Sequence, residues 1–162
     1  MVHHGGRPDQ SIPAFSRFEP ALNVERDGFI ISSDPGRFDF GAIERLLRSS
    51  YWAGERSRQV IELSIKNSLC FGLYRAGDGK QIGFTRVVTD SATFAWICDV
   101  IVDPAYRGRG LGSWMMGHVL SDPDLRCVRR WILATRDAHD FYAVHGFTPL
   151  ANPDRWMERV RR

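Results

Sequence analysis

Glycine and arginine alternate in the segment Arg107-Gly108-Arg109-Gly110, and a further glycine follows at Gly112. Strand-like residues 96–102 precede this segment, and a helical pattern of apolar residues follows it at once. Glycine lets the backbone bend sharply and lets its amides approach a bound group. The first amides of a helix have no internal partner and carry partial positive charge, so they attract anions such as phosphate. The two arginines add full charges and forked donors. The segment therefore predicts a phosphate-binding turn.

The spacing of these glycines excludes two common nucleotide sites. It is not the G-x-G-x-x-G pattern of nicotinamide-binding folds, and no Lys-Ser/Thr pair follows as in a nucleotide P-loop. Arg-Gly repeats also occur in flexible RNA-binding tails. A strand before the segment and a helix after it favour the phosphate-binding turn over such a tail.

Residues 102–112 (V-D-P-A-Y-R-G-R-G-L-G) resemble the V-x-P-x-x-R/Q-G-x-G-x-G/A signature of the GNAT acyltransferases. The resemblance implies acetyl-coenzyme A as co-substrate, with its pyrophosphate in this loop and no metal. It also implies that the pantetheine arm lies between the fourth and fifth strands, which end at Val102 and Thr135. The family pattern usually has Asn where this chain has Thr135, so a hydroxyl or a backbone group replaces that contact. The cofactor-binding residues implied are Val100, Ile101, Val102, Arg107, Gly108, Arg109, Gly110, Leu111, Gly112, Ser113, Thr135, Ala138 and Tyr142.

A second motif, residues 137–147, resembles the N-x-x-A-x-x-x-Y-x-x-x-G-F segment of the same family. Ala138, Tyr142, Gly146 and Phe147 fall at the matching positions. The resemblance assigns Tyr142 as the catalytic donor to the leaving sulfur. A phenol with a pKa of about 10 stays protonated at neutral pH and can donate to a thiolate whose thiol has a pKa of about 8.5. The alternative for Tyr142 is an ordinary half-buried helix aromatic.

The general base has two candidates. Asp99 is the one ionisable residue in the apolar segment 93–102, and desolvation there would favour its taking up a proton. The competing interpretation is an Asp neutralised by a nearby arginine such as Arg86, and both stay open. His139 is the second candidate, because it opens the helix that carries Tyr142.

The acceptor pocket of the family is built by the loop between the first two helices and by the central hairpin. Tyr51 and Trp52 lie in that loop with the mixed charges of Glu55, Arg56 and Arg58. Tyr51, Trp52 and, on the hairpin, Arg86 are therefore the candidate substrate-binding residues. The aromatic pair could recognise a small amine with an apolar body, or it could plug the core.

The elements that must position these residues follow from periodicity and turn signals. Their order is that of the GNAT fold, an α/β (α+β) class with a mixed, mostly antiparallel sheet of six or seven strands. Four helices flank the sheet, which is splayed between strands four and five. The predicted strands are 28–33, 69–75, 81–90, 93–102, 129–135, 147–151 and 155–160, and the predicted helices are 40–51, 57–68, 110–120 and 137–145.

Length and composition fit one domain. The chain has 162 residues, of which 43% are hydrophobic and 25% charged, as in ordinary globular proteins. We expect a disordered or loosely packed arm over residues 1–22 and a single domain over 23–162. No apolar run suits a membrane span or a signal peptide, so a cytoplasmic protein without a membrane partner is expected. Three scattered cysteines without a C-x-x-C pair predict neither disulfides nor a zinc site.

These features predict an acetyl-CoA-dependent N-acetyltransferase. It would acetylate a primary amine of a small molecule or peptide by direct attack in a ternary complex. The alternative is a catalytically degenerate member that binds acyl-CoA as a sensor or partner protein. A net charge of +3 suits an anionic cofactor but is too small to argue for nucleic acid. A homodimer is one expectation, since dimers are common in the family.

Overall fold

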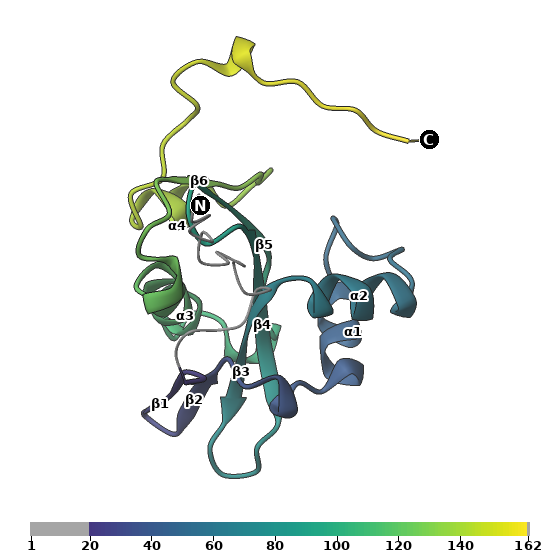
Figure 1. The fold of residues 1–162 in the computed structure, drawn as a ribbon. Helices are drawn as coiled ribbons and strands as arrows, with labels where there is room; N and C mark the ends of the chain where they lie inside the picture. The colour runs from purple at the N-terminus through teal and green to yellow at the C-terminus, as the bar shows by residue number, and fades with distance from the viewer. Residues whose placement is uncertain (1–19, 162) are drawn as a thin grey trace, which may run out of the picture.

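A mixed sheet of six strands organises residues 20–161, the part of the chain that this computed structural model describes (Figure 1). The strands lie in chain order, and each neighbouring pair is antiparallel except the parallel pair β5 and β6. The sheet confirms the predicted mixed, mostly antiparallel architecture. The strands are β1 (Asn23–Arg26), β2 (Phe29–Ser32), β3 (Leu69–Arg75), β4 (Gln81–Thr89), β5 (Phe94–Val102) and β6 (Arg130–Ile132).

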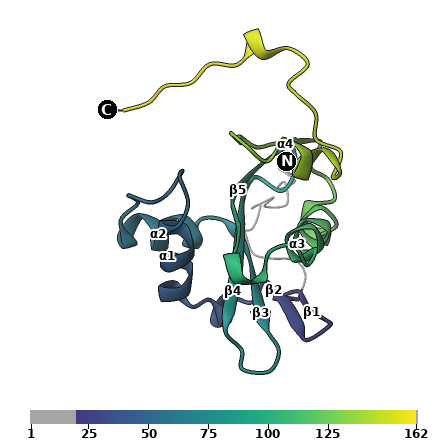
Figure 2. The same cartoon turned by 180° about the vertical axis from the view of Figure 1, so that it is seen from behind.

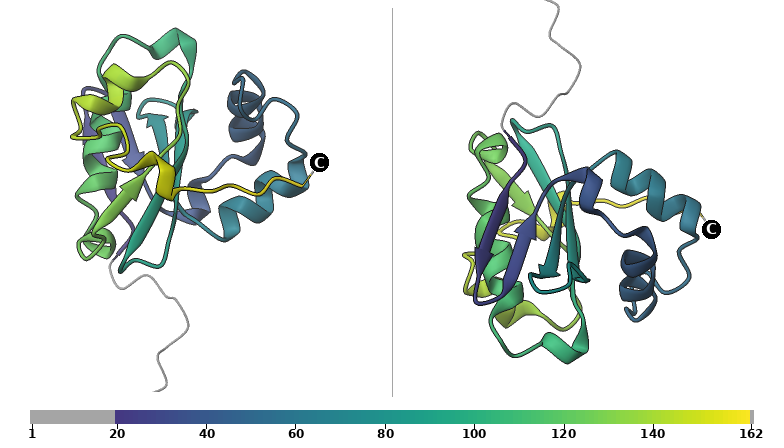
Figure 3. Two further views of the ribbon diagram at one scale, coloured as in Figure 1. Left: turned by 90° about the horizontal axis from the view of Figure 1, so that it is seen from above. Right: turned by 90° about the horizontal axis from the view of Figure 1, so that it is seen from below.

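Helices cover both faces of the sheet. The pair α1 (Phe40–Arg48) and α2 (Arg58–Lys66) lies on one face, and α3 (Leu111–Leu120) and α4 (His139–Ala143) lie on the other (Figures 1 and 2). The views from above and below show the sheet edge-on between these two layers (Figure 3). The four α-helices of the described residues agree in order with the prediction, although the first ends at Arg48 rather than at residue 51.

Side-chain caps set where α1 and α2 begin. Asp39 precedes α1, and its Oδ1 accepts a hydrogen bond of 2.9 Å from the amide of Ala42. Ser57 precedes α2, and its side chain accepts from the amide of Val60. Each cap satisfies an amide that the helix itself leaves without a partner.

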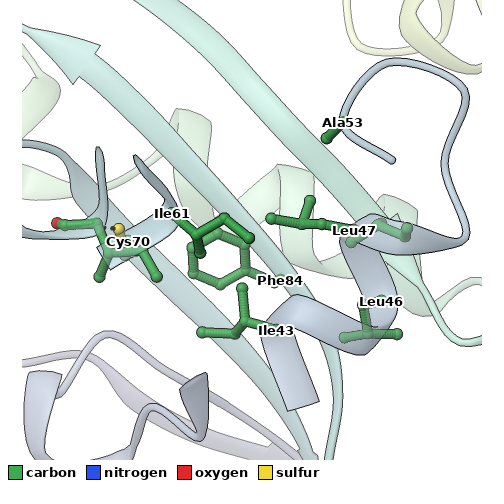
Figure 4. Close-up of a cluster of buried hydrophobic side chains, with 9 residues drawn as sticks. Ile43, Leu46, Leu47, Ala53, Ile61, Cys70 and Phe84 are labelled. Carbon is green, nitrogen blue, oxygen red and sulfur yellow. Dashed lines mark hydrogen bonds between the residues drawn. The ribbon is translucent and has the colours of Figure 1, made fainter. Parts of the chain in front are cut away.

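The core under α1 and α2 is centred on Phe84 of β4. Figure 4 shows its ring between Ile43 of α1 and Ile61 of α2, and all three side chains are fully or almost fully buried. On the opposite face, Leu111 and Met115 of α3 pack against the sheet. Because both faces of β3 and β4 are covered, most of their residues are buried.

The predicted single strand 28–33 is instead the second half of a hairpin. β1 and β2 pair from Asn23–Ser32 to Arg26–Phe29. Asp27 and Gly28 join them with φ values of 51° and 80°, and two successive positive φ angles characterise the Asp-Gly hairpin turn. The prediction missed β1 because its four residues are mostly exposed and carry no apolar alternation.

Only two of the four apolar side chains of α2 are buried. Ile61 and Ile65, one turn apart, are buried, but Val60 and Leu63 are exposed. A helix that lies on a sheet buries a narrow stripe, so two of the four apolar side chains stay outside it.

The two predicted closing strands, 147–151 and 155–160, do not form. Residues 147–151 pair with no strand, and the chain from residue 156 to 161 extends away from the body (Figures 1 and 2). Met157 is 98% exposed. A strand needs a neighbour for its backbone hydrogen bonds, and within residues 20–161 none lies beside these segments. β6 is therefore an edge strand.

The predicted N-terminal arm falls mostly outside the described residues, which begin at residue 20. Leu22, the last residue of the predicted arm, contacts the domain. Its amide donates a hydrogen bond of 2.8 Å to Ser33 Oγ, and its side chain packs on the core. Within residues 20–161, no helix is long and apolar enough to cross a membrane, and no group of three or more histidine, cysteine or acidic side chains could hold a metal ion.

Candidate active site

The turn between β5 and α3 has the open backbone that the glycines predict. Gly108 and Gly110 have φ values of 74° and 71°, a conformation that L-residues rarely adopt. A Cβ built at either position would meet no atom within 4 Å. Gly110 is the N-cap of α3, and the first amides of that helix lack internal partners. An anion can therefore reach these amides without displacing a side chain, as a phosphate of CoA requires.

A cavity of about 420 Å³ lies beside this turn. It is bounded by the end of β5, the turn, the start of α3 and the first part of α4. Eleven of the thirteen predicted cofactor-binding residues line it: Val100, Ile101, Val102, Arg107, Gly108, Gly110, Leu111, Gly112, Ser113, Ala138 and Tyr142. Tyr106 and Phe141 also line it and were not predicted.

Two predicted cofactor residues do not line that cavity. The Arg109 guanidinium carbon lies 5.5 Å from the centre of the Tyr106 ring and borders a separate shallow hollow. Thr135 Oγ1 accepts a hydrogen bond of 3.0 Å from the amide of Ala138, so it shapes the turn into α4. Arg107 does line the cavity, and its Nε donates to the carbonyl oxygen of Val102 at 2.9 Å.

The sheet opens where the cavity begins. β5 pairs with β6 only from Phe94 to Trp96, opposite Arg130 to Ile132. β6 is therefore shorter than the predicted strand 129–135, and β5 continues to Val102 without it. The backbone of residues 97–102 has an edge free of β6, at the expected position between the fourth and fifth predicted strands.

Tyr142 reaches the cavity from α4. Burial raises the pKa of its phenol to about 12, with smaller contributions from the Tyr51 phenol and the Cys98 thiol. Phe147 packs edge-on against the ring at 6.0 Å and donates its amide to the Tyr142 carbonyl at 3.2 Å. The phenol is therefore a fixed group that stays protonated through the neutral range.

Asp99 lies at a bulge in β5. Phe84 pairs with Ile101 and Arg86 pairs with Cys98, so two residues of β5 oppose one residue of β4. Asp99 adopts a φ of 56°, and its side chain is 2% exposed. The bulge directs the carboxylate to the face that α1 and α2 cover.

Both oxygens of Asp99 accept hydrogen bonds from arginine. Arg56 Nη1 lies 3.1 Å from Oδ1 and 2.9 Å from Oδ2, and Arg86 Nε lies 2.5 Å from Oδ2. The contact with Arg86 was the alternative to the general-base role. Arg56 was not predicted as a partner, because it is 43 residues away in sequence. Both carboxylate oxygens are therefore occupied by arginine donors, as in the alternative to the general-base role, and Asp99 is not among the residues that line the cavity.

The loop after α1 contacts the segment before α4. The Tyr51 hydroxyl accepts a hydrogen bond of 2.9 Å from the amide of Arg136, whose guanidinium carbon lies 3.7 Å from the centre of the Tyr51 ring. Trp52 packs edge-on against Tyr51 at 4.9 Å. Both rings are exposed, so they do not plug the core. The Tyr51 phenol is also close enough to Tyr142 to contribute to its raised pKa.

Two histidines border the site. His139 is exposed and lines a second hollow with Thr135 and Tyr142. His145 looks like an ordinary helix residue in the sequence, yet its Nε2 lies 3.0 Å from Oγ of the predicted cofactor residue Ser113. The contact of His145 with Ser113 has no signal in the local sequence, because it joins α3 to a residue 32 positions away that only the fold brings close.

Comparison with known proteins agrees with this geometry. A model of the acetyltransferase (GNAT) domain matches residues 66–149. An acetyltransferase-like protein of Gibberella zeae is 32% identical over 142 residues, which cover 74% of this chain and 78% of that protein.

Solved structures have the same fold. A GNAT-family acetyltransferase from Xanthomonas campestris pv. campestris has a TM-score of 0.78 at 42% identity, covering 82% of this chain and 93% of that one. A Mycobacterium tuberculosis protein crystallised in complex with CoA has a TM-score of 0.61 at 25% identity, covering 74% and 72%. With a matching family model over half of its length and a glycine turn open to phosphate, this chain belongs to the GNAT family of N-acetyltransferases.

Proposed function

We propose that this protein transfers an acetyl group from acetyl-CoA to a primary amine of a small molecule or peptide by direct attack in a ternary complex. One observation supports this most strongly. One cavity is lined both by Gly108 and Gly110, where no side chain blocks the backbone, and by Tyr142, whose phenol stays protonated through the neutral range. Phosphate binding and proton donation are thus available to one extended ligand.

Different segments of the chain would bind different parts of acetyl-CoA. The amides at the start of α3 would hold the pyrophosphate, and the guanidinium of Arg107 would add charge there. The free backbone edge at residues 100–102 would bond the pantetheine arm as an added strand does. Ala138 and Gly112 are small, so α4 and α3 leave room between them.

When bound, acetyl-CoA supplies the activated acetyl group as a thioester. An amide of the free β5 edge would polarise the carbonyl as the amine attacks. Tyr142 would donate its phenolic proton to the departing sulfur, because a phenol with a pKa of about 12 is protonated at the pH of the reaction. His139, at the start of α4 beside Tyr142, is the remaining side-chain candidate for the base.

A titration calorimetry experiment tests cofactor binding. Acetyl-CoA, CoA and desulfo-CoA are titrated separately, and micromolar binding of all three is expected because the phosphates carry the affinity. Absence of binding by all three would refute both the transferase and the acyl-CoA sensor.

Substitution Tyr142→Phe separates those two functions. Turnover should fall by about 100-fold or more, as expected for loss of a general acid, while CoA affinity stays unchanged. Tyr74→Phe is the matched control, since it removes a phenol buried away from the cavity. Unchanged turnover in Tyr142→Phe would refute the acid role, and no turnover of any amine by the wild type would favour the sensor.

A further inference from the structure

Three ionised side chains from three elements meet at the bulge of β5. Arg56 comes from the loop before α2, Arg86 from β4 and Asp99 from β5. Their side chains are 22%, 13% and 2% exposed. Two guanidinium groups face one carboxylate, so the cluster carries one positive charge in excess. Among residues 20–161, neither arginine has an ion pair with any other acidic group.

Donor groups of both arginines remain without partners in the described part of the chain. Arg56 uses only Nη1 toward Asp99, which leaves its Nε and Nη2. Arg86 uses Nε toward Asp99 and Nη1 toward Ser68 Oγ at 3.3 Å, which leaves its Nη2. One arginine suffices to neutralise a buried carboxylate. A second, mostly buried cation costs free energy unless an anion compensates it.

The excess charge lies close to the cavity that Tyr142 lines, because Asp99 directly precedes Val100, which lines the same cavity. The Cys98 thiol links the two, because its pKa, raised by burial, responds to the charges of Arg86, Asp99 and Arg56. The same thiol contributes to the raised pKa of Tyr142. Arg56 also lies in the loop that carries the exposed rings of Tyr51 and Trp52. The Tyr51 hydroxyl accepts a hydrogen bond from the amide of Arg136 shortly before α4, so the loop that carries the rings and Arg56 lies near the helix that carries Tyr142.

We propose, on the basis of the transferase function above, that the acceptor is a small amine that carries a carboxylate, such as a free amino acid. Its carboxylate accepts hydrogen bonds from the unused donors of Arg56 and Arg86, since the guanidinium fork matches carboxylate geometry. This contact neutralises the excess charge and holds the acceptor beside Tyr142. The exposed Tyr51 and Trp52 rings contact its apolar part.

Matched acceptors test the proposal. Each member of a panel of amino acids is compared with its carboxamide and with the amine that lacks the carboxyl group, using acetyl-CoA at saturation. For the preferred side chain, kcat/KM should be about 10- to 100-fold higher for the free acid, as expected for charge-assisted hydrogen bonds. Equal rates for the three forms would overturn the proposal.

The substitution Arg56→Gln should bring that ratio close to one through a rise in KM for the free acid. Acetyl-CoA affinity should change little, because Arg56 does not line the cofactor cavity, and thermal melting shows whether the variant folds with Arg86 as the remaining partner of Asp99. Arg58→Gln is the matched control, as Arg58 is the exposed neighbour that pairs with Glu62 at 2.7 Å. An unchanged ratio in a folded Arg56→Gln protein would overturn the assignment.

A binding measurement separates this proposal from the transferase function. The free acid and its carboxamide are titrated into the protein saturated with CoA. Selective binding of the acid without turnover would support the carboxylate site and refute the transferase function. Turnover without selective binding of the acid would support the transferase function and overturn the carboxylate site. If no free acid binds and no amine is acetylated, both proposals are overturned.

Discussion

Gly110 is where backbone conformation and cofactor binding can be separated by experiment. Its φ is 71°, and a Cβ added there would point into open space next to the first amides of α3. Gly79, in the hairpin between β3 and β4, has a φ of 69° and an equally open Cβ direction. Gly110→Ala and Gly79→Ala therefore impose a similar backbone strain, but only the first places a methyl group beside the amides that we propose to hold the phosphates of CoA.

The size of each effect follows from this geometry. An L-residue in the left-handed conformation costs roughly 1–2 kcal/mol. For a domain of this size, 1 kcal/mol lowers Tm by about 2–4 °C, so both variants should melt about 2–8 °C lower than the wild type. In Gly110→Ala the methyl group also keeps a phosphate from the amides. Loss of one or two charged hydrogen bonds weakens CoA binding by about 10- to 100-fold.

Thermal melting and calorimetric titration with CoA measure the two effects independently. Gly79→Ala should lose stability and keep its CoA affinity within about 2-fold. If Gly110→Ala also keeps its affinity, residues 108–112 do not hold the phosphates. If instead Gly79→Ala loses CoA binding, backbone strain far from the turn also weakens binding. The comparison would then not support a phosphate site at residues 108–112.

Three further predictions concern stability and assembly. A Cβ at Gly72 would overlap the buried ring of Tyr74, so Gly72→Ala should lower the free energy of unfolding by about 1–3 kcal/mol in urea titrations. The Tyr74 hydroxyl is buried without a hydrogen-bond partner in the described residues, so Tyr74→Phe should unfold at the same or a higher urea concentration; a clear loss of stability would reveal a missing partner. If the exposed segment 156–161 pairs with a second copy, light scattering should give a dimer mass that Met157→Glu reduces, whereas a monomer at all concentrations would contradict the expected homodimer.

Local signals were sufficient to predict the glycine turn between β5 and α3. The turn at residues 102–112 depends on glycines at fixed spacing, on a preceding strand and on the start of a helix, and all three are adjacent in sequence. The beginnings of α1 and α2 are likewise encoded by the caps Asp39 and Ser57. The Asp27-Gly28 turn was also a local signal, and it could have predicted β1.

The residues that we assign to acceptor binding are held by contacts that sequence periodicity cannot reveal. Arg56 and Asp99 are 43 residues apart, and Tyr51 and Arg136 are 85 apart. The predicted strands 147–151 and 155–160 do not form for a related reason. Their residues favour extended backbone, but a strand forms only where another strand offers its hydrogen bonds, and β-propensity cannot tell whether a neighbour is present.

The bulge at Asp99 shows how one local irregularity positions both halves of the site. Side chains alternate along a strand, and Ala95 packs toward α3, so an unbroken β5 would direct Asp99 toward the same apolar face. The extra residue reverses the alternation, so Asp99 meets the arginines while Val100 and Val102 contact the α3 cluster and line the cofactor cavity. An Asp with φ of 56° is strained, but the two guanidinium contacts offset that cost. The charge that we assign to the acceptor and the backbone edge that we assign to pantetheine thus depend on the same backbone feature.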